Sequence, residues 1–127
     1  MKEAVIVSAV RTPIGKYAGF LSRLEGYQLG GIVVKEAVRR AGIDPNLIEE
    51  VYMGNAEGAP GDLGRVVALE ADLPESIPGI QFDRQCASGL ETICMAAAMH
   101  SGPTISQPIN TQTNRAETQA KTDVNVG

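Results

Sequence analysis

The first hundred residues alternate between the hydrophobic patterns of strands and of helices. Residues 4–10 form a run of small and β-branched apolar side chains, which is typical of a strand covered on both faces, as in parallel sheets. Between residues 25 and 41, apolar side chains recur every three or four positions and Gly42 follows, which predicts a helix that ends at this glycine. Asp44 and Pro45 then form a helix-start pair.

The same alternation continues to residue 100. Residues 51–54 and 78–84 predict two further strands, and residues 63–72 predict a helix between them. Residues 87–100 are rich in Ala, Leu, Ile and Met and predict a buried helix. The order of these elements predicts an α/β fold over residues 1–100, with a mixed, mostly parallel sheet and helices packed against it.

The composition changes near residue 100. Ser, Thr, Asn and Gln together number 11 in residues 1–100 but 13 in residues 101–127, and Leu is absent from the second stretch. A segment with so few apolar side chains buries too little surface to offset the entropy lost on ordering. We therefore expect residues 101–127 to form an unstructured polar tail, with an ordinary exposed terminus as the alternative.

Charge and cysteine content narrow the functional classes. The chain has 11 Lys and Arg against 15 Asp and Glu, a net charge of −4, so it lacks the basic surface typical of proteins that bind nucleic acid or anionic membranes. No apolar run is long enough to span a bilayer, and no stretch at the N-terminus resembles a signal peptide. Two cysteines with no evident pairing fit a reducing compartment. We expect a cytoplasmic protein.

Candidate chemistry lies at the last junction between strand and helix. Cys86 falls there, where free amide groups and the helix dipole favour an anion and so a reactive thiolate. Ala87, Ser88 and Gly89 are small and would let a substrate approach the backbone, whose amides could donate to an oxyanion. Cys86 is therefore a candidate nucleophile. The alternative, on this pattern alone, is a buried structural cysteine.

The other cysteine and the single histidine give no second site. Cys94 lies eight residues along the same predicted helix, a rise of about 12 Å from Cys86, which is too far for a disulfide. We interpret it as a core residue. His100 is about 20 Å along the helix from Cys86 and is expected to be a helix-end or solvent-exposed residue, not a base. With one histidine and no closely spaced cysteine pair, no metal site is predicted.

Four blocks of sequence together resemble the thiolases, the acyl-CoA C-acyltransferases. They are residues 5–16 (VIVSAVRTPIGK), 51–55 (VYMGN), 64–69 (GRVVAL) and 83–90 (DRQCASGL). The last block is similar to the one around the acyl-accepting cysteine of the family, which assigns that role to Cys86. A ketoacyl-synthase relative is the runner-up, but residues 11–16 favour the thiolase branch.

The resemblance implies a Claisen-type reaction that runs in either direction. Cys86 would form a thioester with an acyl group and pass that group between coenzyme A thioesters, with acetyl-CoA or a 3-ketoacyl-CoA as substrate. The family needs no metal or further cofactor, works in fatty acid metabolism, and usually forms homo-oligomers.

The resemblance fades after His100. The family continues with a second α/β half that brings a histidine in a Gly-His-Pro block and a second catalytic cysteine, and neither block occurs in residues 101–127. We expect the N-terminal part of a thiolase, cut short by truncation or a change of reading frame, which is aggregation-prone and has little or no turnover alone. Two alternatives are an interaction module that binds a full-length thiolase and a small thiol-reactive protein that uses Cys86 alone.

Overall fold

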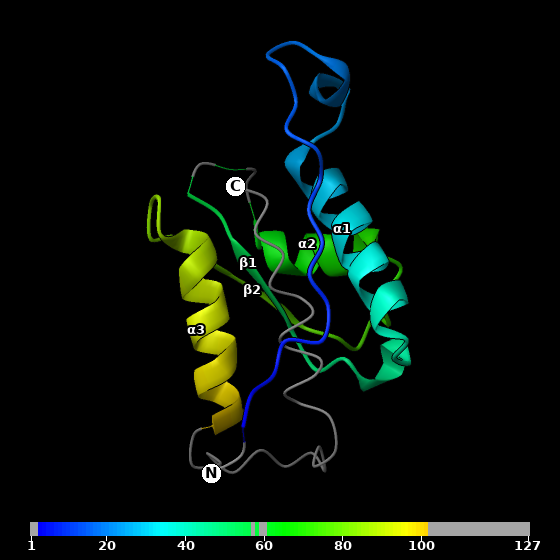
Figure 1. Cartoon of the computed structure of the whole chain (residues 1–127), viewed down its shortest axis with the longest axis vertical. Coiled ribbons are helices and arrows are strands. Elements are labelled where there is room, and N and C mark those ends of the chain that lie inside the picture. The colour runs from blue at the N-terminus through cyan, green and yellow to red at the C-terminus, as the bar shows by residue number, and fades with distance from the viewer. Residues whose placement is uncertain (1–2, 57, 59–60, 102–127) are drawn as a thin grey trace.

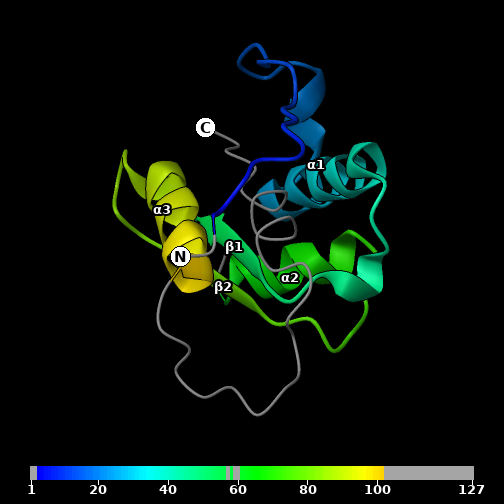
Figure 2. The same ribbon diagram turned by 60° about the horizontal axis from the view of Figure 1, so that its bottom comes forward.

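The computed structural model describes residues 3–56, 58 and 61–101, with the backbone but not the side chains of His100 and Ser101. In chain order the elements are the 3-10 helix η1 (Phe20–Arg23), α1 (Gly26–Ala41), the 3-10 helix η2 (Pro45–Leu47), β1 (Val51–Gly54), α2 (Leu63–Glu70), β2 (Gly79–Phe82) and α3 (Ser88–Ser101). Helix α3 lies on one side of the strands and helices α1 and α2 lie on the other (Figure 1), an arrangement that the turned view of Figure 2 preserves. The predicted α/β fold is confirmed for this part of the chain.

Strands β1 and β2 form a parallel pair, and α2 makes the crossover between them. Val51 pairs with Gly79 and Gly54 pairs with Phe82, so the carboxyl ends of both strands lie side by side. The rings of Tyr52 and Phe82 stack with their centroids 6.1 Å apart. Because the strands are parallel and in this register, the turn from β2 to α3 starts at the same edge of the sheet as the loop that follows β1.

Helix α1 has the predicted start and end. The side chain of Gln28 accepts a hydrogen bond of 2.9 Å from the amide of Glu25, the residue that precedes the helix. Gly42 takes a left-handed conformation with φ of 66° and donates to the carbonyls of the last turn, as glycine does after many helices. The predicted apolar face is confirmed except at Ile32, which is exposed.

The core lies between α1, α2 and the inner face of the strands. Its largest fully buried side chains are three valines from three elements, Val34, Val51 and Val67. Glycines in the middle of α1 allow the close contact between the two helices: a Cβ on Gly31 would lie 2.5 Å from Cγ of Glu70, and one on Gly30 would lie 2.7 Å from Cγ2 of Val67. The small residues bring α2 against α1 and so fix how the layer packs.

The strand predicted for residues 4–10 is wrong for the structure described. These residues are extended but pair with no described strand, and Val5, Ile6 and Val7 are exposed. Only Val10 packs against the core. The run of β-branched residues records a preference for burial, but a strand forms only where a neighbouring strand accepts and donates its backbone hydrogen bonds.

The observed ends of some other elements differ from the predicted ends by one or a few residues. Helix α2 ends at Glu70 and not at residue 72, because Asp72 takes a left-handed conformation with φ of 57° that ends the helix. Helix α3 includes Ser101, and the rest of the tail predicted for 101–127 lies outside the described residues. In the described part of the chain, no helix is both long and apolar enough to cross a membrane.

Candidate active site

The candidate nucleophile lies in the turn that joins β2 to α3. Cys86 is exposed and comes two residues before Ser88, the first residue of α3. The predicted position at the amino-terminal end of a helix is therefore confirmed. The positive end of the helix dipole lies at this end of α3, where the amide of Ser88 already donates to the carbonyl of Gln85.

The turn has an unusual backbone conformation at the residue before the cysteine. Gln85 has φ of 50°, in the left-handed region that non-glycine residues seldom adopt. Its amide donates a hydrogen bond of 3.0 Å to Oδ1 of Asp83. This Asp83 contact closes the turn on the strand side, so the chain reverses direction just before Cys86.

Ser88 closes the turn on the helix side. Its hydroxyl accepts a hydrogen bond of 2.9 Å from the amide of Arg84 and donates one of 2.7 Å to the carbonyl of Gln85. The amide of Ala87 also donates to the carbonyl of Arg84, at 3.0 Å. Ser88 is only 6% exposed, so the two bonds of its hydroxyl are partly buried.

The end of β1 packs against the same turn. A Cβ on Gly54 would lie 2.9 Å from the carbonyl carbon of Ser88 and 3.0 Å from the amide nitrogen of Gly89. Only glycine allows the strand to approach the start of α3 this closely. The next residue, Asn55, donates from its amide to the carbonyl of Phe82 at 2.9 Å, which extends the contact between the strands up to the turn.

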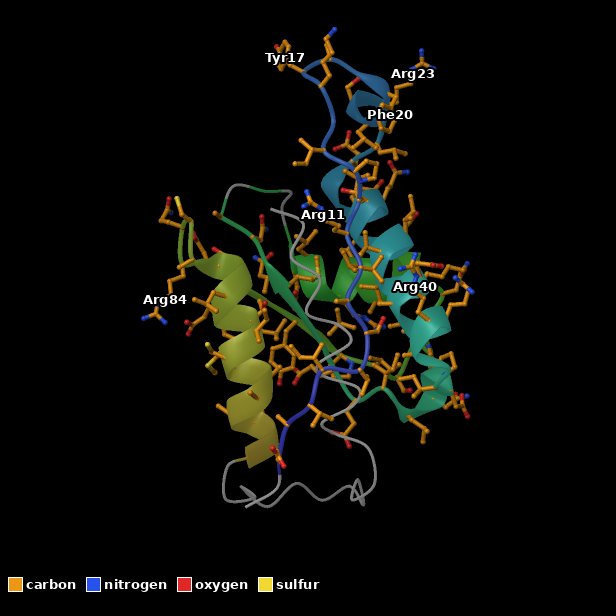
Figure 3. All side chains as sticks on the ribbon, viewed as in Figure 1. Arg11, Tyr17, Phe20, Arg23, Arg40 and Arg84 are labelled. Carbon is orange, nitrogen blue, oxygen red and sulfur yellow. The ribbon has the colours of Figure 1, made fainter. Side chains whose placement is uncertain are left out.

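An ion pair flanks the cysteine. The guanidinium of Arg84 contacts the carboxylate of Glu91 in the first turn of α3, and Figure 3 shows Arg84 beside this end of the helix. An acidic side chain in a first helical turn interacts favourably with the helix dipole. Because Arg84 is directed at Glu91, its charge serves to hold the turn onto the helix.

Cys94 is exposed, so its interpretation as a core residue was wrong. The face of α3 toward the strands carries residues at four-residue spacing, Ser88, Thr92 and Ala96, which are all buried. Leu90 and Cys94 lie on a different face and are exposed, so the prediction of a buried helix over residues 87–100 is correct for one face of α3 and wrong for the other. Apolar residues occur all round this helix, so the sequence pattern gave no direction from which to choose the buried side.

The remaining candidates give no second centre. His100 lies in the last turn of α3, as predicted, and its side chain is outside the described residues. Among the residues that the structure describes, no group of three or more His, Cys, Asp or Glu side chains could hold a metal ion. The sequence pattern indicated only that Ser88 is a small residue and did not predict its bonds to the turn. A serine two positions after a cysteine is too common a pattern to predict such bonds.

Most of this chain is similar to known proteins of one family. The family model described as the N-terminal domain of thiolase matches residues 4–102. The acetyl-CoA acetyltransferase of Cupriavidus necator is 38% identical over 99 residues, which are 76% of this chain and 25% of that protein. The mitochondrial acetyl-CoA acetyltransferase of Homo sapiens is 44% identical over 99 residues, which are 76% of this chain and 23% of that protein.

A solved structure has the same fold. The crystal structure of the Bacillus anthracis acetyl-CoA acetyltransferase matches with a TM-score of 0.75 and 36% sequence identity, covering 78% of this chain and 26% of that one. The chain thus spans about a quarter of the length of these relatives. Because the family model covers most of the chain and the fold agrees, this chain belongs to the thiolase family.

Proposed function

We propose that this chain carries the acyl-accepting cysteine of a thiolase-type acyltransferase and that Cys86 is that nucleophile. Its thiolate would attack the carbonyl carbon of an acyl-CoA and form a bond between Sγ and the acyl group. The bond between that carbon and the sulfur of coenzyme A breaks, and the coenzyme A thiolate leaves and takes a proton from solvent. Division of a difficult transfer into two steps through a thioester is the usual advantage of a covalent intermediate.

The observation that carries the proposal is the exposed position of Cys86 in a fixed turn before α3. Exposure allows a thioester to reach the sulfur. Backbone amides at the start of the helix, other than those of Ala87 and Ser88, which already donate to the turn, would donate to the oxyanion that forms when the thiolate attacks. Cys94 is also exposed but lies within the same helix, where the backbone amides are bonded to the preceding turn.

The substrates in this proposal are coenzyme A thioesters. The relatives are named for acetyl-CoA, and we extend this to acetyl-CoA or a 3-ketoacyl-CoA for this chain. In the cleavage direction, attack on the keto carbon breaks its bond to the α-carbon, and the electron pair on the α-carbon takes a proton as acetyl-CoA leaves. We propose no metal or further cofactor, a role in fatty acid metabolism, a homo-oligomeric assembly as in the family, and a cytoplasmic location.

We further propose that the 127-residue chain by itself has little or no turnover. The resemblance assigns acid and base work to a histidine in a Gly-His-Pro block and to a second cysteine, and this sequence has neither block. Loss of a general acid or base costs about 10²–10⁴ in rate. Acylation of Cys86 therefore would proceed slowly, with no condensation after it.

The test is incubation of the purified chain with acetyl-CoA, followed by peptide mass mapping. We expect acetyl on Cys86 and none on Cys94, and no label on either in Cys86→Ser. Cys94→Ser is the matched control and should label like the original protein. Equal acetylation of both cysteines would indicate exposure alone and would refute the proposal. A Cys86 that reacts quickly with an alkylating agent well below pH 8 but not with acetyl-CoA would instead support a small thiol-reactive protein.

A second candidate function, binding to a longer thiolase chain, is favoured by the apolar side chains on the surface. Ile6 is 69% exposed and Leu90 is 64% exposed, on the extended segment and on α3. Large apolar side chains left exposed on a surface can mark a contact with another protein. Co-elution with a full-length thiolase in gel filtration would support this candidate, and elution of the two chains apart would count against it.

A further inference from the structure

The hydroxyl of Ser88 joins the two residues that precede Cys86. It accepts from the amide of Arg84 at 2.9 Å and donates to the carbonyl of Gln85 at 2.7 Å. We infer that Ser88 is a positioning residue, which holds the Cys86 sulfur at the amino-terminal end of α3 for acyl transfer. This inference rests on the proposed function of Cys86.

The direction of these bonds distinguishes Ser88 from an ordinary helix cap. A capping serine accepts from amides further along its own helix, whereas Ser88 reaches back to the turn before it. Thr92 provides the contrast within the same helix. It is buried as well, but its hydroxyl donates only to the carbonyl of Gly89, at 2.7 Å, which is a bond inside the helix.

The turn needs such a support because it contains Gln85 with φ of 50°. A left-handed non-glycine residue is held in place only when surrounding contacts determine its conformation. If the hydroxyl is removed, the Arg84 amide loses its acceptor, while the Gln85 carbonyl keeps only the amide of Ser88, at 3.1 Å. The backbone next to Cys86 would then be held less firmly.

Ser88 itself cannot shift to compensate. It is 6% exposed, and the two bonds of its hydroxyl are partly buried. On one side the backbone of Gly54 lies so close that a Cβ there would be 3.1 Å from Cβ of Ser88. The serine is thus enclosed between the end of β1 and the turn, and its hydroxyl is bonded to the turn.

The experiment compares Ser88→Ala with Thr92→Val, which removes a buried hydroxyl from the same helix without touching the turn. Two rates are measured at Cys86 by peptide mass mapping: acetylation by acetyl-CoA, which forms an oxyanion, and alkylation by iodoacetamide, which does not. Alkylation of Cys94 is the internal reference for folding. A small misplacement of reacting groups costs up to about 100-fold in rate.

In Ser88→Ala we expect acetylation of Cys86 to fall by about 10-fold to 100-fold, while alkylation of both cysteines changes by less than about twofold. Thr92→Val should leave both rates as they were. The inference is overturned if Ser88→Ala acetylates at the original rate. It is overturned equally if acetylation and alkylation fall together, or if Thr92→Val has the same effect, because both results would indicate general destabilisation.

Amide hydrogen exchange separates this inference from the proposed function and needs no variant that might unfold. In the original protein the Arg84 amide should exchange slowly for a residue in an exposed turn, because Ser88 accepts its hydrogen bond. Exchange at the rate of a free amide would refute the positioning role. If Arg84 is protected but Cys86 is never acetylated, the turn is held as inferred and the proposed function fails.

Discussion

Gly79 of β2 and Gly64 of α2 touch backbone to backbone. A Cβ on Gly79 would lie 2.1 Å from the carbonyl carbon of Gly64, and a Cβ on Gly64 would lie 2.5 Å from the amide nitrogen of Ile80. Neither neighbour is a flexible side chain that could move aside. This contact sets the distance between α2 and the strand that leads to Cys86.

Gly79→Ala should therefore destabilise the protein by about 1–3 kcal/mol or more, as overpacking of a tight contact does. The free energy of unfolding is measured by urea denaturation. Gly26→Ala is the matched control, because a Cβ at Gly26 would meet nothing within 4 Å and alanine favours a helix. Equal loss in the two variants would contradict the packing account.

Arg65 holds the segment that leads into β2. Its guanidinium donates to the carbonyl of Ile77 at 2.6 Å and to that of Glu75 at 2.9 Å. A hydrogen bond from a charged donor stabilises by about 1.5–3 kcal/mol. Because the bond to Ile77 is partly buried and the bond to Glu75 is exposed, Arg65→Ala should lower the free energy of unfolding by about the value of one such bond. Arg23→Ala, at an exposed arginine, is the control and should have no measurable effect. A stable Arg65→Ala protein would show that these contacts are dispensable.

Glu36 provides a prediction about pH. Hydrogen bonds of 2.7 Å from Arg39 and Arg40 lower the pKa of the Glu36 carboxyl from 4.5 to about 2. Because the folded pKa is the lower one, the contribution to stability is present above pH 4.5 and is lost as the pH falls toward 2. Carboxyl titration by NMR should give a midpoint near 2. In the double variant Arg39→Gln and Arg40→Gln the pKa should return toward 4.5; an unchanged midpoint would argue against the pairing.

Both cysteines should react in the native protein. Cys86 and Cys94 are exposed and free, so a thiol reagent such as Ellman's should titrate both without denaturant. Iodoacetamide mapping then assigns each site. A native count of one thiol that becomes two in urea would restore the interpretation of Cys94 as a core residue and would contradict the exposed face of α3.

The exposed apolar side chains predict self-association. Ile6 and Leu90 are well exposed on the extended segment and on α3, and large apolar surface promotes aggregation. We expect concentration-dependent association in sedimentation, which the double variant Ile6→Lys and Leu90→Lys should reduce. Ser76→Lys, at an exposed polar site, adds the same kind of charge and should not. If all the variants associate as strongly as the original protein, the contact between copies does not involve Ile6 or Leu90.

The sequence by itself determined the local structure and the candidate nucleophile. Three-residue and four-residue spacing predicted α1, and Gly42 marked its end because a left-handed residue satisfies the last carbonyls. A short apolar run predicted β1, and an alternating pattern over residues 78–84 predicted β2. The position of Cys86 between strand and helix followed from the same local pattern, since dipole and capping effects act within one turn.

Tertiary structure alone decided which faces are buried and how the turn is held. Residues 4–10 had a pattern typical of a buried strand, yet in the described part of the chain no strand pairs with them. Cys94 had apolar neighbours on every side, so only the contact of α3 with the strands showed that it faces outward. The approach of Gly54 to Ser88 joins backbone positions far apart in sequence, and the bonds of Ser88, although local in sequence, depend on the left-handed conformation of Gln85 in the turn. Local patterns report a preference for burial, but a partner surface has to exist before that preference is met.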